Sequence, residues 1–162
     1  ICTYREILET QGVRVALSVA RADYLDALSG LIDQMHDALA RADADAYGQL
    51  DTAFHNAAFD HCANSYLQDA NRLVAGRIAA LRANITAPYA ERRAESMAEH
   101  RAMLDMLSKG DLSAFDAALA THIRRTGVVY SRALAEGHLG SAATSPATSP
   151  ATGPDTSKET TT

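Results

Sequence analysis

Residues 43–62 read DADAYGQLDTAFHNAAFDHC, and this stretch decides how the chain is expected to fold. Its apolar residues recur at the spacing of one face of an α-helix: Leu50, Phe54, Ala57 and Ala58. Asp43 or Asp45 can cap the first turn, because an Asp side chain accepts hydrogen bonds from the backbone N–H groups that start a helix. The stretch therefore predicts a helix that ends near Cys62 and packs one face into a core.

The same spacing of apolar residues continues on both sides and predicts five further helices. They are expected over residues 3–20, residues 23–42, from residue 64 or 65 onward, from the turn around Pro88 to the glycine stop at Gly110, and from the cap Asp111 to about residue 136. No window alternates with a period of two, so no sheet is predicted. The expected fold class is all-α, an antiparallel bundle of six or seven helices.

The composition changes at residue 141. Residues 141–162 are dominated by Ser, Thr, Pro, Ala and Gly and contain no Leu, Ile, Val or aromatic residue. Such a segment buries too little apolar surface to offset the entropy lost on ordering. We expect a helical domain over residues 1–140 and a disordered tail over residues 141–162.

Charge and cysteine content exclude several classes of protein. The chain has 15 basic and 20 acidic residues, a net charge of -5, which argues against nucleic-acid binding by this chain itself. Its two cysteines, Cys2 and Cys62, indicate thiols in a reducing compartment rather than a disulfide scaffold. No apolar run approaches the 18 residues of a membrane span, so a cytoplasmic protein is expected.

Four residues carry the candidate chemistry: Asp51, His55, His100 and His122. Asp51 and His55 are one turn apart and flank the apolar face of their helix, while His100 and His122 lie on the apolar faces of two later helices. A core imidazole needs a partner for its ring nitrogens, and a divalent metal bound by three imidazoles and one carboxylate would supply it. Zinc suits these ligands best, and nickel or manganese would also fit.

Other interpretations remain open on the residues alone. An Asp and a His four residues apart often occur by chance, and each histidine could instead be a hydrogen-bonded core residue of a metal-free interaction module. A helical metalloenzyme, a hydrolase or oxygenase, would use the same ligands with Glu99 or Asp105 as its base. Glu99 is expected to face away from the metal, however, because neighbouring helix positions point about 100° apart.

Several short motifs, in this order, resemble one known family. The first is REILE at Arg5–Glu9, which resembles the Arg-x-x-Leu-Glu of the family's first helix. The others are DTAFH at Asp51–His55, NSYL at Asn64–Leu67, Glu99-His100, Gly110-Asp111 and Thr121-His122-Ile123. Together they resemble the effector-binding (FCD) domain of GntR-family transcription regulators of the FadR-type subgroup. The resemblance runs from about Thr3 to Glu136.

The resemblance implies a metal-dependent ligand sensor rather than an enzyme. In the metal-binding branch of this family one Asp and three His hold the ion, and these positions match Asp51, His55, His100 and His122. The ion and an arginine then hold a small carboxylate metabolite; Arg5 is at the matching position, and Arg72 and Arg77 are weaker candidates. The resemblance also implies a homodimer that binds operator DNA, most often as a repressor, through an N-terminal winged helix-turn-helix domain that we expect to be absent from this chain.

Overall fold

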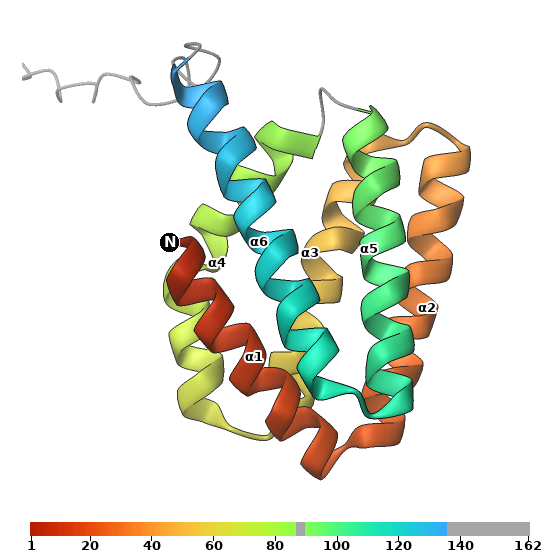
Figure 1. The fold of residues 1–162 in the computed structure, drawn as a ribbon, viewed down its shortest axis with the longest axis vertical. Coiled ribbons are helices and arrows are strands. Elements are labelled where there is room, and N and C mark those ends of the chain that lie inside the picture. Colours follow the sequence, from red (N-terminus) through yellow and green to blue (C-terminus); the bar gives the residue numbers. More distant parts are fainter. Residues whose placement is uncertain (87–89, 136–162) are drawn as a thin grey trace, which may run out of the picture.

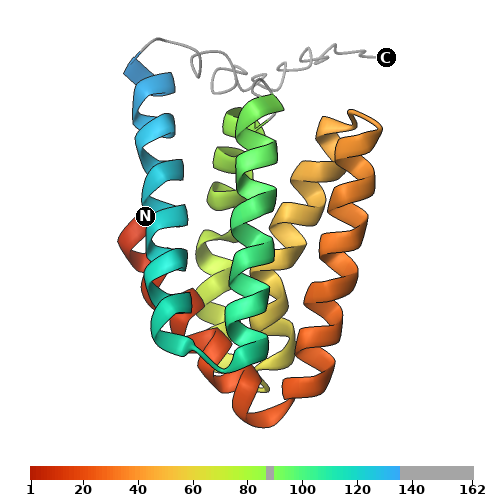
Figure 2. The ribbon, with the colours of Figure 1, turned by 45° about the vertical axis from the view of Figure 1, so that its right-hand side comes forward.

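Six α-helices make up the part of the chain that the structure, a computed structural model, describes, residues 1–86 and 90–135. In chain order they are α1 (Cys2–Val19), α2 (Arg21–Ala40), α3 (Ala44–His61), α4 (Ser65–Thr86), α5 (Ala90–Lys109) and α6 (Leu112–Ala135). Figures 1 and 2 show them running up and down along one long axis, joined by short connections. The predicted all-α antiparallel bundle is confirmed.

The helix ends follow from local side-chain chemistry. Asp43 is the cap of α3, since its Oδ1 accepts a hydrogen bond from Ala46 N at 2.9 Å. Asn64 caps α4 by accepting from the N–H groups of two residues in its first turn. Gly110 has a φ of +77°, the left-handed conformation that ends α5 and that glycine adopts without strain.

The start of α2 differs from the sequence prediction. α2 begins at Arg21, two residues before the expected start at Asp23. Ala20 alone separates α1 from α2: its φ of -146° leaves the helical region, and its carbonyl already accepts a hydrogen bond from Tyr24 N. Asp23 therefore lies inside the first turn of α2, where a carboxylate interacts favourably with the helix dipole.

Helix α3 packs against α1, α2 and α4, while α5 lies between α2 and α6, and α6 returns to α1. α1 and α3 approach closely at Gly12, where an added Cβ would lie 3.1 Å from the ring of Phe59. The core between the helices is apolar and includes Leu28, Met35, Tyr47, Met103, Leu107 and Ile123. Buried among these side chains are the polar groups that matter for function.

Some expectations cannot be compared with the fold. Pro88, expected in the first turn of the fifth helix, and residues 141–162, expected to form a disordered tail, lie outside the described residues. Among the helices that are described, none is both long enough and apolar enough to cross a membrane.

Candidate metal centre

Three histidines meet in the interior of the bundle, each from a different helix. His55 on α3, His100 on α5 and His122 on α6 are at most 4% exposed. One ring nitrogen from each lies within 4.8 Å of the other two, and the rings of His55 and His122 are stacked at 5.1 Å. The register of three separate helices thus brings together the three imidazoles that the sequence predicts.

Two pairs of the predicted ligand atoms have nearly the spacing of a tetrahedral site. With zinc–nitrogen bonds of about 2.0–2.1 Å, two tetrahedral ligands lie about 3.3 Å apart. The Nε2 atoms of His55 and His100 are 3.3 Å apart, and Asp51 Oδ1 is 3.5 Å from His100 Nε2. The donor set, two to three imidazoles and a carboxylate, is one that zinc, nickel and manganese all accept.

The predicted ligand Asp51 is 3% exposed, a costly location for a carboxylate without a positive partner. Tyr47, one turn earlier on α3, is fully buried beside it and donates its hydroxyl to the Arg93 carbonyl oxygen at 3.0 Å. Burial, and then the nearby charge of Asp51, raise the pKa of Tyr47 well above its ordinary value. Tyr47 therefore stays protonated and acts as a hydrogen-bond donor.

Two glutamates hold histidines of this cluster from behind. Glu9 Oε2 lies 2.7 Å from His55 Nδ1, and Glu99 Oε2 lies 2.7 Å from His122 Nδ1. Glu9 is on α1 and is 5% exposed, whereas the Glu99 side chain, on α5, is 22% exposed. The sequence analysis included Glu9 in a motif but gave it no role beside His55, because a position 46 residues before His55 gives no local signal of their contact.

Glu99 does not have the properties of a base. Burial opposes its ionisation, but hydrogen bonds from His122 and Arg92 outweigh burial and lower the pKa of Glu99 to about 2. Arg92 Nη2 is 3.2 Å from the carboxylate, and Arg125 forms a second ion pair with it. Glu99 thus contacts the outer nitrogen of His122 and remains an ionised acceptor.

Arg5 is buried beside the cluster. It is 5% exposed, and its Nε is hydrogen-bonded to Glu9 Oε1, so that Glu9 connects Arg5 to His55. The Arg5 Nη2 atom is buried and has no hydrogen-bond partner among the described residues. A buried guanidinium nitrogen of this kind is suited to an anionic oxygen.

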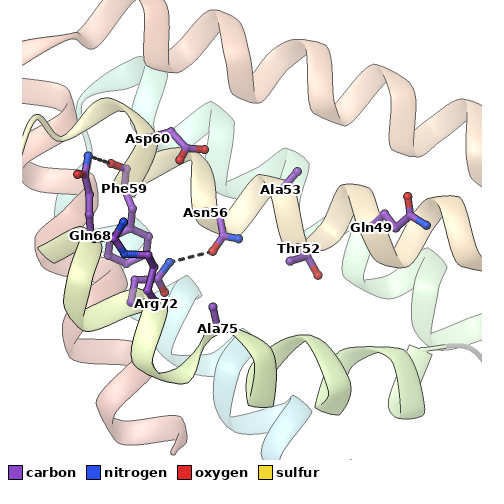
Figure 3. A pocket seen from close by; sticks show the side chains of 10 residues that line it. Gln49, Thr52, Ala53, Asn56, Phe59, Asp60, Gln68, Arg72 and Ala75 are labelled. Carbon is purple, nitrogen blue, oxygen red and sulfur yellow. Dashed lines mark hydrogen bonds between the residues drawn. The ribbon is translucent and has the colours of Figure 1, made fainter. Parts of the chain in front are cut away.

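The other two predicted effector residues lie elsewhere. Arg72 and Arg77 are exposed on α4, and Arg72 forms an ion pair with Asp69. Arg72 lines a separate groove of about 660 Å³ between α3 and α4, shown in Figure 3, to which none of the four predicted metal ligands contributes. The groove is edged by amides, among them Asn56 and Asn71, which are hydrogen-bonded to each other at 3.1 Å.

Comparison with protein families matches the FCD domain over residues 1–125. The chain belongs to the FCD domain family. FCD domains are the C-terminal effector-binding domains of GntR-family transcription regulators. The predicted resemblance to this domain of GntR-family regulators is therefore confirmed. This FCD domain is therefore the ligand-sensing part of such a regulator, and FCD domains are not enzymes. A comparison with curated protein sequences finds no match.

Proposed function

We propose that this FCD domain senses a small carboxylate metabolite with the help of a divalent metal ion, and that the bound metabolite controls operator binding by the regulator. The observation that supports this proposal is the meeting of three buried histidines from three helices, beside a buried carboxylate. We also propose that the regulator belongs to the FadR-type subgroup. We propose in addition that it is located in the cytoplasm, where it reaches operator DNA.

Four side chains would hold the ion: Asp51, His55, His100 and His122. Their donor atoms fit zinc best, with nickel and manganese as alternatives. A bound ion supplies positive charge and an open ligand position for a carboxylate oxygen. It would also offset the cost of burying Asp51, whose Oδ1 lies 3.5 Å from His100 Nε2.

Arg5 is our first candidate for the second oxygen of the metabolite carboxylate. Its guanidinium is buried, is fixed by Glu9, and has its Nη2 atom without a hydrogen-bond partner in the described residues. A carboxylate that paired with Arg5 would gain a charge-assisted hydrogen bond at little cost in side-chain entropy. Arg72 and Arg77 remain weaker candidates, because both side chains are exposed on α4.

The helices that carry these groups could transmit the signal. α1 carries Arg5, while α3, α5 and α6 carry the histidines. A ligand held by these side chains therefore favours the arrangement of the four helices that binds it more tightly. Coupling between two sites is typically about 1–3 kcal/mol, a roughly 5- to 150-fold change in affinity. In the regulator this change would appear as altered operator binding by a winged helix-turn-helix domain, most often as loss of repression.

Elemental analysis of the purified chain tests the metal. We expect about one zinc, nickel or manganese ion per chain, and much less in an Asp51→Ala variant and in a His100→Ala/His122→Ala double variant. The matched control is His36→Ala, which removes an exposed histidine of α2. Absence of metal from the wild type, even after zinc is added, would refute the metal site and favour a metal-free interaction module.

The effector class is tested by melting shifts with a panel of small mono-, di- and hydroxycarboxylates on the metal-loaded protein. A carboxylate that raises the melting temperature of the wild type should do so much less in Arg5→Gln. An equal shift in both proteins would remove Arg5 from the effector site.

We further propose that the domain forms a homodimer through α1 and α4. Tyr4 and Ile7 on α1 and Tyr66 and Leu73 on α4 are large apolar side chains with 40–85% exposure. The two helix faces adjoin, since the Tyr4 hydroxyl donates to the Ala70 carbonyl oxygen at 3.4 Å. Contiguous exposed apolar surface of this kind typically marks an interface.

The charges on α4 favour a second copy of this chain as the partner. Asp69 and Arg72 are exposed and lie between Tyr66 and Leu73. If α4 packs antiparallel against its symmetry mate, Tyr66 meets the partner's Leu73, and Asp69 meets the partner's Arg72. Such self-complementarity is what a two-fold symmetric interface requires.

Sedimentation analysis tests this interface. Leu73→Glu should convert the dimer to a monomer, whereas Val19→Glu, at an exposed apolar site near the end of α1, should leave the dimer intact. A wild-type monomer at high concentration, or a dimeric Leu73→Glu protein, would refute the proposed interface.

The geometry weakens the enzymatic alternative. A metallohydrolase needs a base that reaches a metal-bound water, but Glu99 is already paired with His122, Arg92 and Arg125. Asp105 is exposed and paired with Lys109. Turnover of a carboxylate effector by the purified protein, abolished by a chelator, would revive this alternative.

A further inference from the structure

The histidine cluster has an outer layer of charged residues that is built in the same way twice. Behind His55 is Glu9, and behind Glu9 is Arg5. Behind His122 is Glu99, and behind Glu99 are Arg92 and Arg125. Each row runs from a histidine to a glutamate to an arginine.

These contacts determine which ring nitrogen faces the centre of the cluster. An ionised carboxylate only accepts hydrogen bonds, so the Nδ1 atoms of His55 and His122, each 2.7 Å from a glutamate oxygen, must carry the proton. The lone pair of a neutral ring is then on Nε2. For His55 this atom is the one that lies 3.3 Å from His100 Nε2.

The arginines keep the glutamates in place. Arg5 and Glu9 are both at most 7% exposed at the side chain and are one helical turn apart, so this ion pair is fixed inside the bundle. Arg92 is 9% exposed at the side chain and holds Glu99 at 3.2 Å. A buried carboxylate held by both an arginine and an imidazole has little freedom to rotate away.

We propose that Glu9 and Glu99 are positioning residues of the metal site, which fix the Nδ1–H forms of His55 and His122 and so present both Nε2 atoms to the ion. This inference rests on the proposed function, because it needs a metal at the cluster. Neither glutamate touches the ion; each acts through the histidine that it holds. Outer carboxylates of this kind typically change metal affinity by 10- to 100-fold when they are lost.

Zinc affinities, measured by competition with a chromogenic chelator, test the inference. Glu9→Gln and Glu99→Gln should each raise the dissociation constant by about 10- to 100-fold. The matched controls are Glu6→Gln on α1 and Glu95→Gln on α5, whose carboxylates pair with arginines and not with a cluster histidine. These controls should stay within about twofold of the wild type. An unchanged affinity in both test variants would overturn the inference.

A second measurement starts from the wild type, so its main result does not depend on a variant folding. In the zinc-loaded wild type, ¹⁵N spectra of the histidine rings should show protonated Nδ1 and zinc-bound Nε2 for His55 and His122. In Glu9→Gln only the His55 signals should change, and in Glu99→Gln only those of His122. Zinc on Nδ1 of either ring would overturn the inference. If the wild type binds no metal at all, the proposed function fails first, and the two glutamates are then structural partners only.

Discussion

Zinc binding should stabilise the wild-type domain strongly, and a His100→Ala variant should lose this stabilisation. His100 is fully buried on α5. Its Nε2 atom lies 3.3 Å from His55 Nε2 and 3.5 Å from Asp51 Oδ1. Its removal takes away one of the three imidazoles of the cluster. The free energy of zinc binding should therefore fall by the share of one ligand.

The size of the effect follows from linkage. Zinc at 1,000 times its dissociation constant stabilises the folded state by about 4 kcal/mol. For a domain of this size that is a rise in melting temperature of roughly 12–20 °C. Structural zinc sites are worth about 10–16 kcal/mol over four ligands, so one lost ligand weakens binding by roughly 100- to 1,000-fold. At the same zinc concentration, the variant should then gain at most about 1.4 kcal/mol.

The assay is thermal denaturation with a chelator and with buffered zinc, for each protein separately. Because the shift is taken within one protein, the cost of the cavity that His100→Ala leaves beside Phe54 cancels. His36→Ala, on the exposed face of α2, is the matched control and should show the full wild-type shift. Equal zinc shifts in the wild type and in His100→Ala would refute the reasoning.

Four further predictions concern stability and coupling. Gly110→Ala should destabilise the domain by about 1 kcal/mol, because φ is +77° at this position. Gly30→Ala should stabilise it by about 0.5–1 kcal/mol, because nothing lies within 4 Å of the added Cβ on α2. Urea denaturation measures both changes. Asp43→Ala should cost about 1 kcal/mol in the same assay through loss of the α3 cap. In metal-free protein, the Glu99 ion pairs should stabilise the fold above the ordinary glutamate pKa of 4.5, and this stabilisation should be lost as the pH falls toward 2. The urea midpoint of Glu99→Gln should therefore fall less between pH 7 and pH 3 than that of the wild type. Arg5→Gln should lower zinc affinity even when no carboxylate metabolite is added, because the substitution releases Glu9. An unchanged affinity in a competition titration would contradict this prediction.

The sequence predicts the helices well because their signals are local. Asp43, Gly110 and Asp111 end or begin helices through contacts within three residues of themselves, so each can be recognised without the rest of the fold. The start of α2 was predicted too late for a related reason. Ala20 separates two helices through its backbone angle alone, and an alanine gives no sign of that in the sequence.

The three histidines could be predicted because each lies on the apolar face of its own helix. Whether those faces meet depends on packing between helices, and the structure supplies that information. The motif at residues 5–9 includes Glu9, but its contact with His55 could not be predicted from the sequence, since it requires α1 to lie against α3 at the correct height. The rotation of Glu99 away from His100 could be inferred, but its contact with His122 on α6 depends on how α5 and α6 pack.

The placement of the cluster has a consequence for the time at which it forms during synthesis. Glu9 is in the first helix and His122 in the last, so the complete set of groups exists only after nearly the whole domain has left the ribosome. At about 5–20 residues per second, His122 follows Glu9 by roughly 6–23 s. During that interval α3 exposes Asp51 and His55 without the partners that α5 and α6 bring. Full occupancy of the site would therefore distinguish finished domains from chains that are still being made.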